Sequence, residues 1–372
     1  MDLADMLSYA DIQDLSGIAR NYEIACNTHS KKELIQSILA TIWRNDLLRE
    51  EVGRMEWGEI RFLNSLLFDR RDSFSLEELT ARVKLGIFDA EEKKAVNPRD
   101  LIVRFKRRGW LFNGHSHNNK YLFLIPGDLK TRFCQAISCR FSAELITVSD
   151  APAVYRDEGE LFVDDLLQFL RFVHTNELPL SAEGYLYKKS MQQLSEEFSV
   201  VEGPLPKTAW RFGYGRRFRE YPTRFSFMYD YCFYNGFIDE QPGKLLLTEQ
   251  GKSRLQENRK EDIRQVYRFW LRLYKGPIPN LQSILHWIDL LATSWTSIQS
   301  LRLVIRNLIK PFYYDSADSV FEERIIPMMV HLGLVRIGEQ PQYGTLLRMT
   351  RSGSHMIRGI YVPEEERIIL PD

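Results

Sequence analysis

Two clusters of basic residues are the strongest candidates for chemistry in this sequence. The first runs from position 99 to position 120 and sets six basic residues against a single acid, Asp100: Arg99, Arg104, Lys106, Arg107, Arg108 and Lys120. Arg104, Arg107 and Arg108 are spaced i, i+3 and i+4, so they share one face of a helix. Because a guanidinium pairs with two phosphate oxygens at once, this face is suited to a nucleic-acid backbone.

The second cluster mixes cations with aromatic rings between positions 207 and 224. Its six basic residues face one acid, Glu220: Lys207, Arg211, Arg216, Arg217, Arg219 and Arg224. They alternate with Trp210, Phe212, Tyr214, Phe218 and Tyr221. Aromatic faces stack on unpaired bases, so this mixture, with Tyr214 among the contacts, suits single strands or duplex junctions. The alternative is that the rings form a core and the arginines only its solvated side.

A third basic stripe follows one face of a helix expected from Asp262 to Tyr274. Its members are Arg264, Arg268, Arg272 and Lys275. This is the ordinary pattern of a surface helix, so we expect it to face solvent or a protein partner rather than DNA.

The sequence offers little for catalysis. Gly251-Lys252-Ser253 is the one apparent nucleotide motif, but a phosphate-binding loop needs a glycine five positions before Gly251, where Leu246 stands. His115 and His117 have no Cys, Asp or Glu close by to complete a metal site. No Gly-x-Ser-x-Gly or His-Glu-x-x-His motif occurs. We therefore expect no enzymatic activity, no cofactor and no metal.

Length and composition limit the other possibilities. The chain has 372 residues, a length that predicts two or three domains. Its 50 basic and 50 acidic side chains give no net charge, so net charge is no argument for nucleic-acid binding. Four cysteines without a Cys-x-x-Cys pair indicate a reducing compartment. The acidic start and the absence of a long apolar run predict a cytoplasmic protein with no membrane partner.

The elements that position the first cluster are predicted to be helices followed by a β-hairpin. Ser75 and Glu78 form a capping box, and Asn97-Pro98 is a good start for the helix that carries the arginines. Gly109 ends that helix, and apolar runs on both sides of Asn113-Gly114 predict a hairpin. Three helices and a two-stranded wing are the winged-helix order, a variant of the helix-turn-helix.

This ending occurs three times, which is the strongest signal in the sequence. A helix stops at Gly109, at Gly236 and at Gly333, and each glycine is followed by one apolar strand, a turn and a second apolar strand. The last two copies then enter a new helix through Thr-x-x-Gly, at Thr248 and Thr350. A glycine supplies the left-handed cap, and a threonine can cap the next helix. The pattern indicates one structural unit used repeatedly.

The first fifty residues predict a separate helical hairpin. An apolar face runs from Ile12 to Tyr22, and Ser30-Lys31-Lys32-Glu33 opens a second helix. Residues 8–43 resemble the SAP fold and the N-terminal domain of the terminator Rho, which bind nucleic acids, so the resemblance implies contacts from Lys31 and Lys32. A hairpin that only packs on the next domain is the alternative.

The repeated Gly-Leu-Val and Leu-x-Leu-Thr-x-x-Gly pattern resembles a known family over residues 55–360. It is similar to the tandem winged-helix N-terminal region of bacterial helicase-associated proteins related to the XPB-type helicases. Leu178-Pro179-Leu180-Ser181 matches the family's entry into a unit, although Ser181 replaces the usual threonine. The resemblance implies an accessory protein of a DNA transaction. It does not imply a helicase motor.

These observations together predict a mainly α protein with small β-hairpins, of the α+β class. The expected parts are a SAP-like hairpin, three winged helices and a tail, at residues 1–50, 55–140, 160–260, 261–360 and 361–372, with linkers at 142–160 and 275–279. The expected function is non-catalytic DNA binding or scaffolding on duplex, forked or single-stranded DNA, alongside a helicase or nuclease partner. The alternative is a protein–protein adaptor that does not touch DNA.

Overall fold

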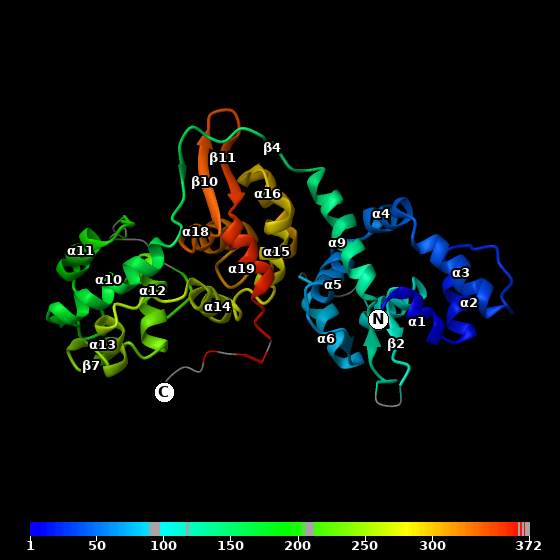
Figure 1. Cartoon of the computed structure of the whole chain (residues 1–372), viewed down its shortest axis with the longest axis horizontal. Helices are drawn as coiled ribbons and strands as arrows, with labels where there is room; N and C mark the ends of the chain where they lie inside the picture. Colours follow the sequence, from blue (N-terminus) through cyan, green and yellow to red (C-terminus); the bar gives the residue numbers. More distant parts are fainter. Residues whose placement is uncertain are drawn as a thin grey trace. The chain divides into compact units, whose positions relative to one another are not determined.

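The computed structural model describes residues 1–88, 97–116, 119–203, 205, 212–363, 365–366 and 368. The protein is mixed α and β and mostly helical, with small antiparallel sheets (Figure 1). It divides into two compact units, Met1–Leu145 and Ile146–Asp372, which are treated separately below. Among the described residues, no helix is long and apolar enough to cross a membrane.

Unit 1 begins with four short helices: α1 (Leu3–Tyr9), α2 (Ile12–Asn21), α3 (Lys31–Ile42) and α4 (Asn45–Arg54). Ser30 caps α3 as expected, since its side chain accepts from the Glu33 amide. The pair α2 and α3 does not stand apart from the rest of the unit. Side chains of Ile18 and Ile42 pack against Gly109, and the Tyr22 hydroxyl donates to the Arg108 carbonyl over 2.8 Å.

The rest of unit 1 surrounds a three-stranded sheet. The elements are α5 (Trp57–Leu67), β1 (Ser73–Phe74), α6 (Leu76–Leu85), α8 (Pro98–Arg107), β2 (Phe112–Asn113), β3 (Phe123–Leu124) and α9 (Gly127–Ser142). The strand order is β1-β3-β2, all antiparallel. Both predicted helix starts are confirmed: Ser75 and Glu78 form the reciprocal capping box of α6, and the Asn97 side chain caps α8. The first strand, β1, was not predicted.

The first half of unit 2 repeats this order. Its elements are α10 (Leu161–Thr175), β6 (Leu178–Pro179), α11 (Lys188–Glu197), α12 (Thr223–Tyr234), β7 (Ile238–Gln241), β8 (Lys244–Leu247) and α13 (Glu249–Gln256). The strand order is β6-β8-β7, so the first strand of the copy again pairs with the last.

The second half of unit 2 repeats the same order of elements once more, with additional helical segments between its strands. Its elements are α14 (Ile263–Tyr274), α15 (Leu281–Leu291), β9 (Trp295–Ser297), α16 (Ile298–Ile305), η1 (Arg306–Leu308), α17 (Ala317–Ser319), the π-helical η2 (Val320–Ile325), α18 (Ile326–His331), β10 (Val335–Gln340), β11 (Gly344–Met349) and α19 (Arg351–Gly359). The inner strands are ordered β9-β11-β10, as in the other two sheets.

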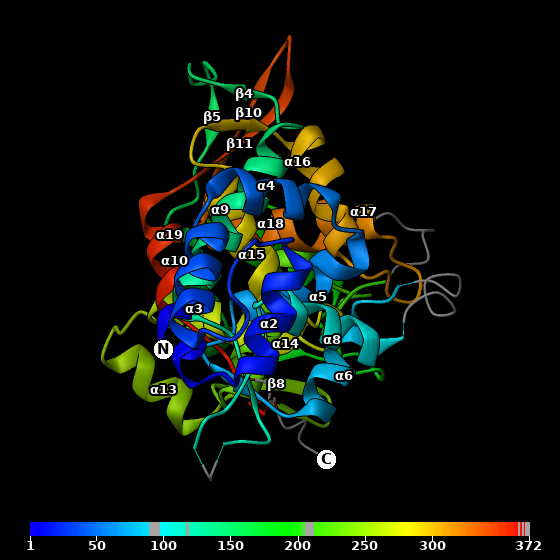
Figure 2. The ribbon, with the colours of Figure 1, turned by 90° about the vertical axis from the view of Figure 1, so that its right-hand side faces the viewer.

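Two strands from the segment before α10 complete this last sheet. β4 (Thr147–Val148) pairs with β9, and β5 (Tyr155–Arg156) pairs with β10, giving the order β4-β9-β11-β10-β5. Figure 1 shows the green segment running beside the β10–β11 hairpin, and Figure 2 labels β4 and β5 near it. The predicted linker at 142–160 contains the boundary between the two units, but part of it also forms both edges of this sheet.

The glycine cap that we predicted is confirmed in all three copies. Gly109, Gly236 and Gly333 have φ angles of 68°, 67° and 64°, the left-handed region that disfavours residues with a Cβ. The next residue always donates its amide five residues back: Trp110 to Phe105, Phe237 to Cys232 and Leu334 to Met329, over 2.8–3.0 Å. These are the bonds of a Schellman cap, which turns the chain from helix into strand.

The predicted Thr-x-x-Gly entry is confirmed in the last two copies. The Thr248 hydroxyl accepts from the Gly251 amide, and the Thr350 hydroxyl accepts from the Gly353 amide. The same hydroxyls donate to the carbonyls of the capping glycines, Gly236 and Gly333. Each threonine therefore ties the helix after the hairpin to the turn before it.

Candidate nucleic-acid interface

An exposed basic surface of unit 1 lies on α8. Leu101, Ile102 and Phe105 are the buried side of this helix, and the Phe105 ring packs edge-on against Trp110 at 5.2 Å between centroids. Burial of that side leaves the opposite side of α8 in solvent. The helix is positioned by its Asn97 cap at the start and the Gly109 turn at the end.

Arg99, Val103 and Arg107 form the outer stripe of α8. They are spaced i, i+4 and i+8 and all are exposed, with Val103 44% accessible. Neither Arg99 nor Arg107 has an ion pair with a residue that the structure describes. An unpaired exposed guanidinium is free to meet a phosphate. Sequence reasoning did not single out Val103, because a valine in a basic helix gives no signal of its own.

Arg104 and Arg108 are turned toward acids of unit 1. Both contact Glu59, at 3.0 Å from Arg104 and 3.4 Å from Arg108. Arg108 also pairs with Glu51 at 3.2 Å and lies over the Trp110 ring. Arg104 remains half-exposed, so it can still contribute to the surface. Arg108 is largely buried and neutralised, and we remove it from the predicted site as a correction.

The remaining predicted cations of unit 1 differ in exposure. Lys106 is half-buried, and Lys120 is exposed with its ammonium 4.9 Å from the centre of the Tyr121 ring. Lys31 and Lys32 are exposed in the first turn of α3, where the helix dipole disfavours a cation. Lys31 and Lys32 have no ion pair in the described part of unit 1. They are accessible, and their helix reaches the end of α8 through Ile42, which packs against Gly109.

Two members of the second cluster are core residues. Arg224 is 1% exposed, and its guanidinium pairs with Asp165 at 2.7 Å and Glu158 at 3.5 Å. Tyr214 is also buried, and its hydroxyl donates to Asp315 over 3.0 Å. Burial, as the first cause, and the neighbouring Asp315 raise the pKa of Tyr214. A buried side chain cannot reach a phosphate or stack on a base, so both are corrected to structural residues.

Arg216 and Arg217 are engaged by one carboxylate. Arg216 forms a two-pronged contact with Glu240 at 3.1 and 3.2 Å, and Arg217 reaches the same group at 2.9 Å. Burial acts to raise the pKa of Glu240, but donation from Tyr229 and the two arginines outweighs it and lowers that pKa. Glu240 therefore stays charged and holds both arginines against β7.

Arg219 is the exposed cation of the second cluster within the described residues. It lies 5.6 Å from the centre of the Phe218 ring and has no ion pair in the described part of unit 2. Lys207 and Arg211 lie outside the residues that the structure describes. The structure therefore divides the second cluster into three groups. Tyr214 and Arg224 lie in the core, Arg216 and Arg217 are held by Glu240, and Arg219 is exposed.

The equivalents of α8 in unit 2 present different surfaces. Residues 224–232 of α12 are all buried, so this helix cannot enter a groove as the structure stands. In the third copy, the corresponding segment carries Asp318 on α17 and exposed Glu322 and Glu323 on η2. Of the three copies, the first alone places a basic exposed helix at this position in the described part of the chain.

The third basic stripe meets the end of the chain. Arg268 Nε donates to Glu366 over 2.9 Å, Arg272 pairs with the same carboxylate at 3.5 Å, and Lys275 donates to the Pro363 carbonyl over 2.6 Å. The hydrogen bond from Arg268, followed by the charges of its neighbours, lowers the pKa of Glu366 despite partial burial. Three residues of this stripe, Arg268, Arg272 and Lys275, therefore contact the end of the chain at Pro363 and Glu366.

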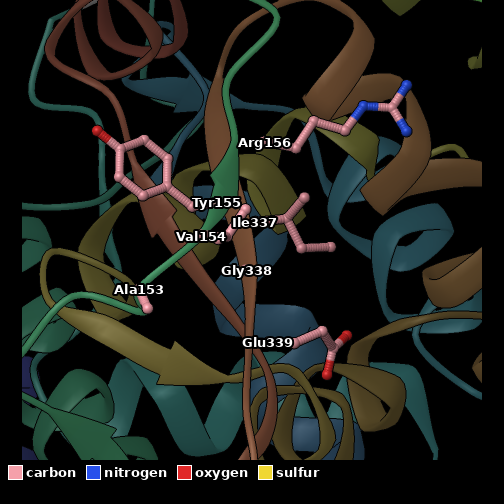
Figure 3. A pocket seen from close by; sticks show the side chains of 7 residues that line it. All are labelled: Ala153, Val154, Tyr155, Arg156, Ile337, Gly338 and Glu339. Atoms are coloured by element: carbon pink, nitrogen blue, oxygen red, sulfur yellow. The ribbon is translucent and has the colours of Figure 1, made fainter.

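A shallow hollow of about 500 Å³ lies beside β5 and β10 (Figure 3). Figure 3 shows Tyr155 and Arg156 pointing to opposite sides of β5, as neighbours on a strand do. Arg156 pairs with Glu158, and Glu339 accepts from the Thr345 hydroxyl, so the charged groups at its rim are engaged. The described residues hold no group of three or more metal-ligating side chains.

Comparison with known proteins adds no relative to this description. No protein-family model matches the chain, and a search of curated proteins finds no match.

Proposed function

We propose that the chain is built from three winged helices, one in unit 1 and two in unit 2. Three observations support this. Each copy contains helix, strand, helix, helix, strand and strand in this order, with η1, α17 and η2 added in the third. Within each copy the first strand pairs with the last, and each hairpin follows the same glycine cap. In the winged-helix arrangement the helix before the hairpin enters the major groove, and in unit 1 that helix is α8.

On this basis we propose that the protein is a non-catalytic DNA-binding or scaffolding factor. The observation that carries the proposal is the exposed stripe of Arg99, Val103 and Arg107 on α8, with Arg104 at its side. The arginines would neutralise phosphates and release counterions, and Val103 would face base edges, where an apolar side chain contacts a thymine methyl. The resemblance described above favours a place beside a helicase or nuclease.

A protein-docking role is the alternative, and it fits the third copy best. The corresponding segment of the third copy offers a phosphate backbone no exposed arginine or lysine, because its one arginine, Arg324, is buried and pairs with Asp315 and Glu323. The buried α12 likewise offers no groove-reading surface in the second copy. We therefore assign duplex contact to unit 1 and leave the acidic face of the third copy to a protein partner.

Charge reversal on α8 tests the proposal. We expect the full chain carrying Arg99→Glu and Arg107→Glu to bind a 20-base-pair duplex at least about tenfold more weakly than the unchanged chain, because two phosphate contacts become repulsive. Fluorescence anisotropy with a labelled duplex at 50 mM salt measures the affinity.

A matched control separates local contact from general charge. Arg49→Glu changes an exposed arginine of α4 in the same unit and should lower the affinity by less than about twofold. Equal losses for both proteins would remove α8 as the contact surface. No duplex binding by the unchanged chain would leave the docking role as the better account.

A further inference from the structure

A second hollow of unit 2, of about 370 Å³, lies where α18 meets the β10–β11 hairpin. Its walls are mostly aliphatic: Ile326 and Val330 come from α18, Ile298 from the start of α16 and Ile337 from β10. Arg156 of β5 lies at its rim, because it pairs in register with Ile337, and Figure 3 shows both side chains on the same side of the sheet. The volume falls in the range of small-molecule sites, roughly 300–1,000 Å³.

His331, the last residue of α18, is the polar group inside this hollow. The residue is 7% exposed and lines the hollow with its ring. Its Nδ1 lies 3.2 and 3.1 Å from the two carboxylate oxygens of Glu158, so Nδ1 donates to that group. Its Nε2 has no hydrogen-bond partner among the described residues. A neutral histidine that donates from Nδ1 keeps Nε2 as an acceptor, so the hollow contains one acceptor without a donor.

Glu158 fixes the orientation of this ring. Its side chain is buried, pairs with Arg156 and lies 3.5 Å from Arg224 Nε. Burial acts to raise the pKa of Glu158, but the hydrogen bond from His331, followed by the neighbouring charges, outweighs it and lowers that pKa. A charged carboxylate on Nδ1 keeps the proton on that nitrogen, and Nε2 remains the acceptor that faces the hollow.

The helix wall of the hollow departs from regular α geometry. The π-helical η2 runs directly into α18, whose second residue is Pro327. Because Pro327 has no amide hydrogen, it cannot give the Glu323 carbonyl its α-helical bond, and this favours the wider turn. Glu322 of that turn and Ile326 after it both line the hollow. Single π turns within helices occur frequently at functional sites.

The charges around the hollow restrict the kind of ligand. Three ion pairs account for them: Arg156 with Glu158, Arg224 with Asp165, and Glu322 with Arg302. An ionic ligand would therefore find its counter-ion already engaged among the described residues, and these residues hold no group of three or more metal ligands. An aliphatic wall with one buried acceptor matches an uncharged apolar molecule that carries a hydroxyl.

We propose that this hollow binds a small uncharged phenol, whose hydroxyl donates to His331 Nε2. The aromatic ring lies against the side chains of Ile298, Ile326 and Ile337, and the hydroxyl pairs the acceptor that the fold leaves without a donor. The site goes beyond the proposed DNA contact of α8 and does not depend on it, because the two sites belong to different units.

Two matched ligands test the site in the full chain. We expect 4-ethylphenol to bind at least about fivefold more tightly than ethylbenzene, which lacks the hydroxyl, because only the phenol donates to Nε2. In His331→Asn the amide nitrogen still donates to Glu158 but no acceptor stands in the place of Nε2, so this preference should disappear. Ile337→Trp fills the hollow from β10 and should abolish binding of both ligands. Ligand-observed NMR titration measures the affinities.

Two controls accompany these variants. His174→Asn changes an exposed histidine of α10 in the same unit and should leave both affinities unchanged. The midpoint of urea unfolding shows whether each variant is folded. An undiminished preference for the phenol in folded His331→Asn, undiminished binding by folded Ile337→Trp, or no binding of 4-ethylphenol by the unchanged chain overturns the proposal. Duplex binding through Arg99 and Arg107 is expected to be the same in every one of these proteins.

Discussion

Arg219 and Arg224 lie in one short stretch of sequence and have opposite environments. Arg219 is exposed over a phenylalanine ring, whereas Arg224 is closed among Glu158, Asp165 and Phe162. The sequence identified both as candidate DNA contacts, because alternation of arginine with aromatic residues looks the same for a surface and for a core. The acids that neutralise Arg224 come from positions about sixty residues earlier, and no local pattern reports such a pairing.

Replacement of these two arginines should separate their roles. We expect Arg224→Ala to lower the free energy of unfolding by about 3–5 kcal/mol, because it leaves buried carboxylates without a partner. Arg219→Ala should change it by less than about 0.5 kcal/mol, as for other exposed positions. Urea denaturation followed by circular dichroism gives both values. Equal stability of the two variants would contradict the burial described here.

At the scale of elements, the sequence predicted the helix caps and helix starts, which depend on residues close together in the chain. The three glycine caps, the Ser75 box, the Asn97 start and the Thr248 and Thr350 caps are decided within one turn of chain, and all are confirmed. The two-residue strands β1 and β6 were missed, as were β4 and β5. They have no period of their own and exist because a distant strand offers them backbone partners.

The glycine of the Thr-x-x-Gly entry provides a test of this packing. A Cβ on Gly353 would lie 2.3 Å from the Leu334 carbonyl oxygen, so α19 could not keep its position against the turn. We expect Gly353→Ala to destabilise the protein by about 1–3 kcal/mol, as overpacking does. The measurement is the shift in the urea midpoint.

Gly359 is the matched control because it lies at the end of the same helix with open space around it. Gly359→Ala should be neutral or stabilise the protein by up to about 1 kcal/mol, through a less flexible unfolded chain. If both alanines had the same effect, close contact between α19 and the turn would not explain the motif.

At the scale of the whole molecule, the zero net charge hides an uneven distribution. The exposed stripe of α8 is basic, whereas the corresponding segment of the third copy is acidic. The three copies share an order of elements but expose different side chains, so a function proposed for one copy does not extend to the others. The sequence could predict the order of helices and hairpins and the positions of the basic residues. It could not predict which basic residues remain accessible, because acids such as Glu59 and Glu240 form ion pairs with some of them.

The salt dependence of duplex binding tests most directly whether α8 meets a phosphate backbone. If Arg99, Arg104 and Arg107 contact phosphates, affinity should fall on the order of fortyfold between 50 and 200 mM salt. In the Arg99→Glu, Arg107→Glu protein, the slope of log affinity against log salt should be shallower by about two units. A slope that is the same in both proteins, or near zero in the unchanged chain, would contradict phosphate contact through this helix.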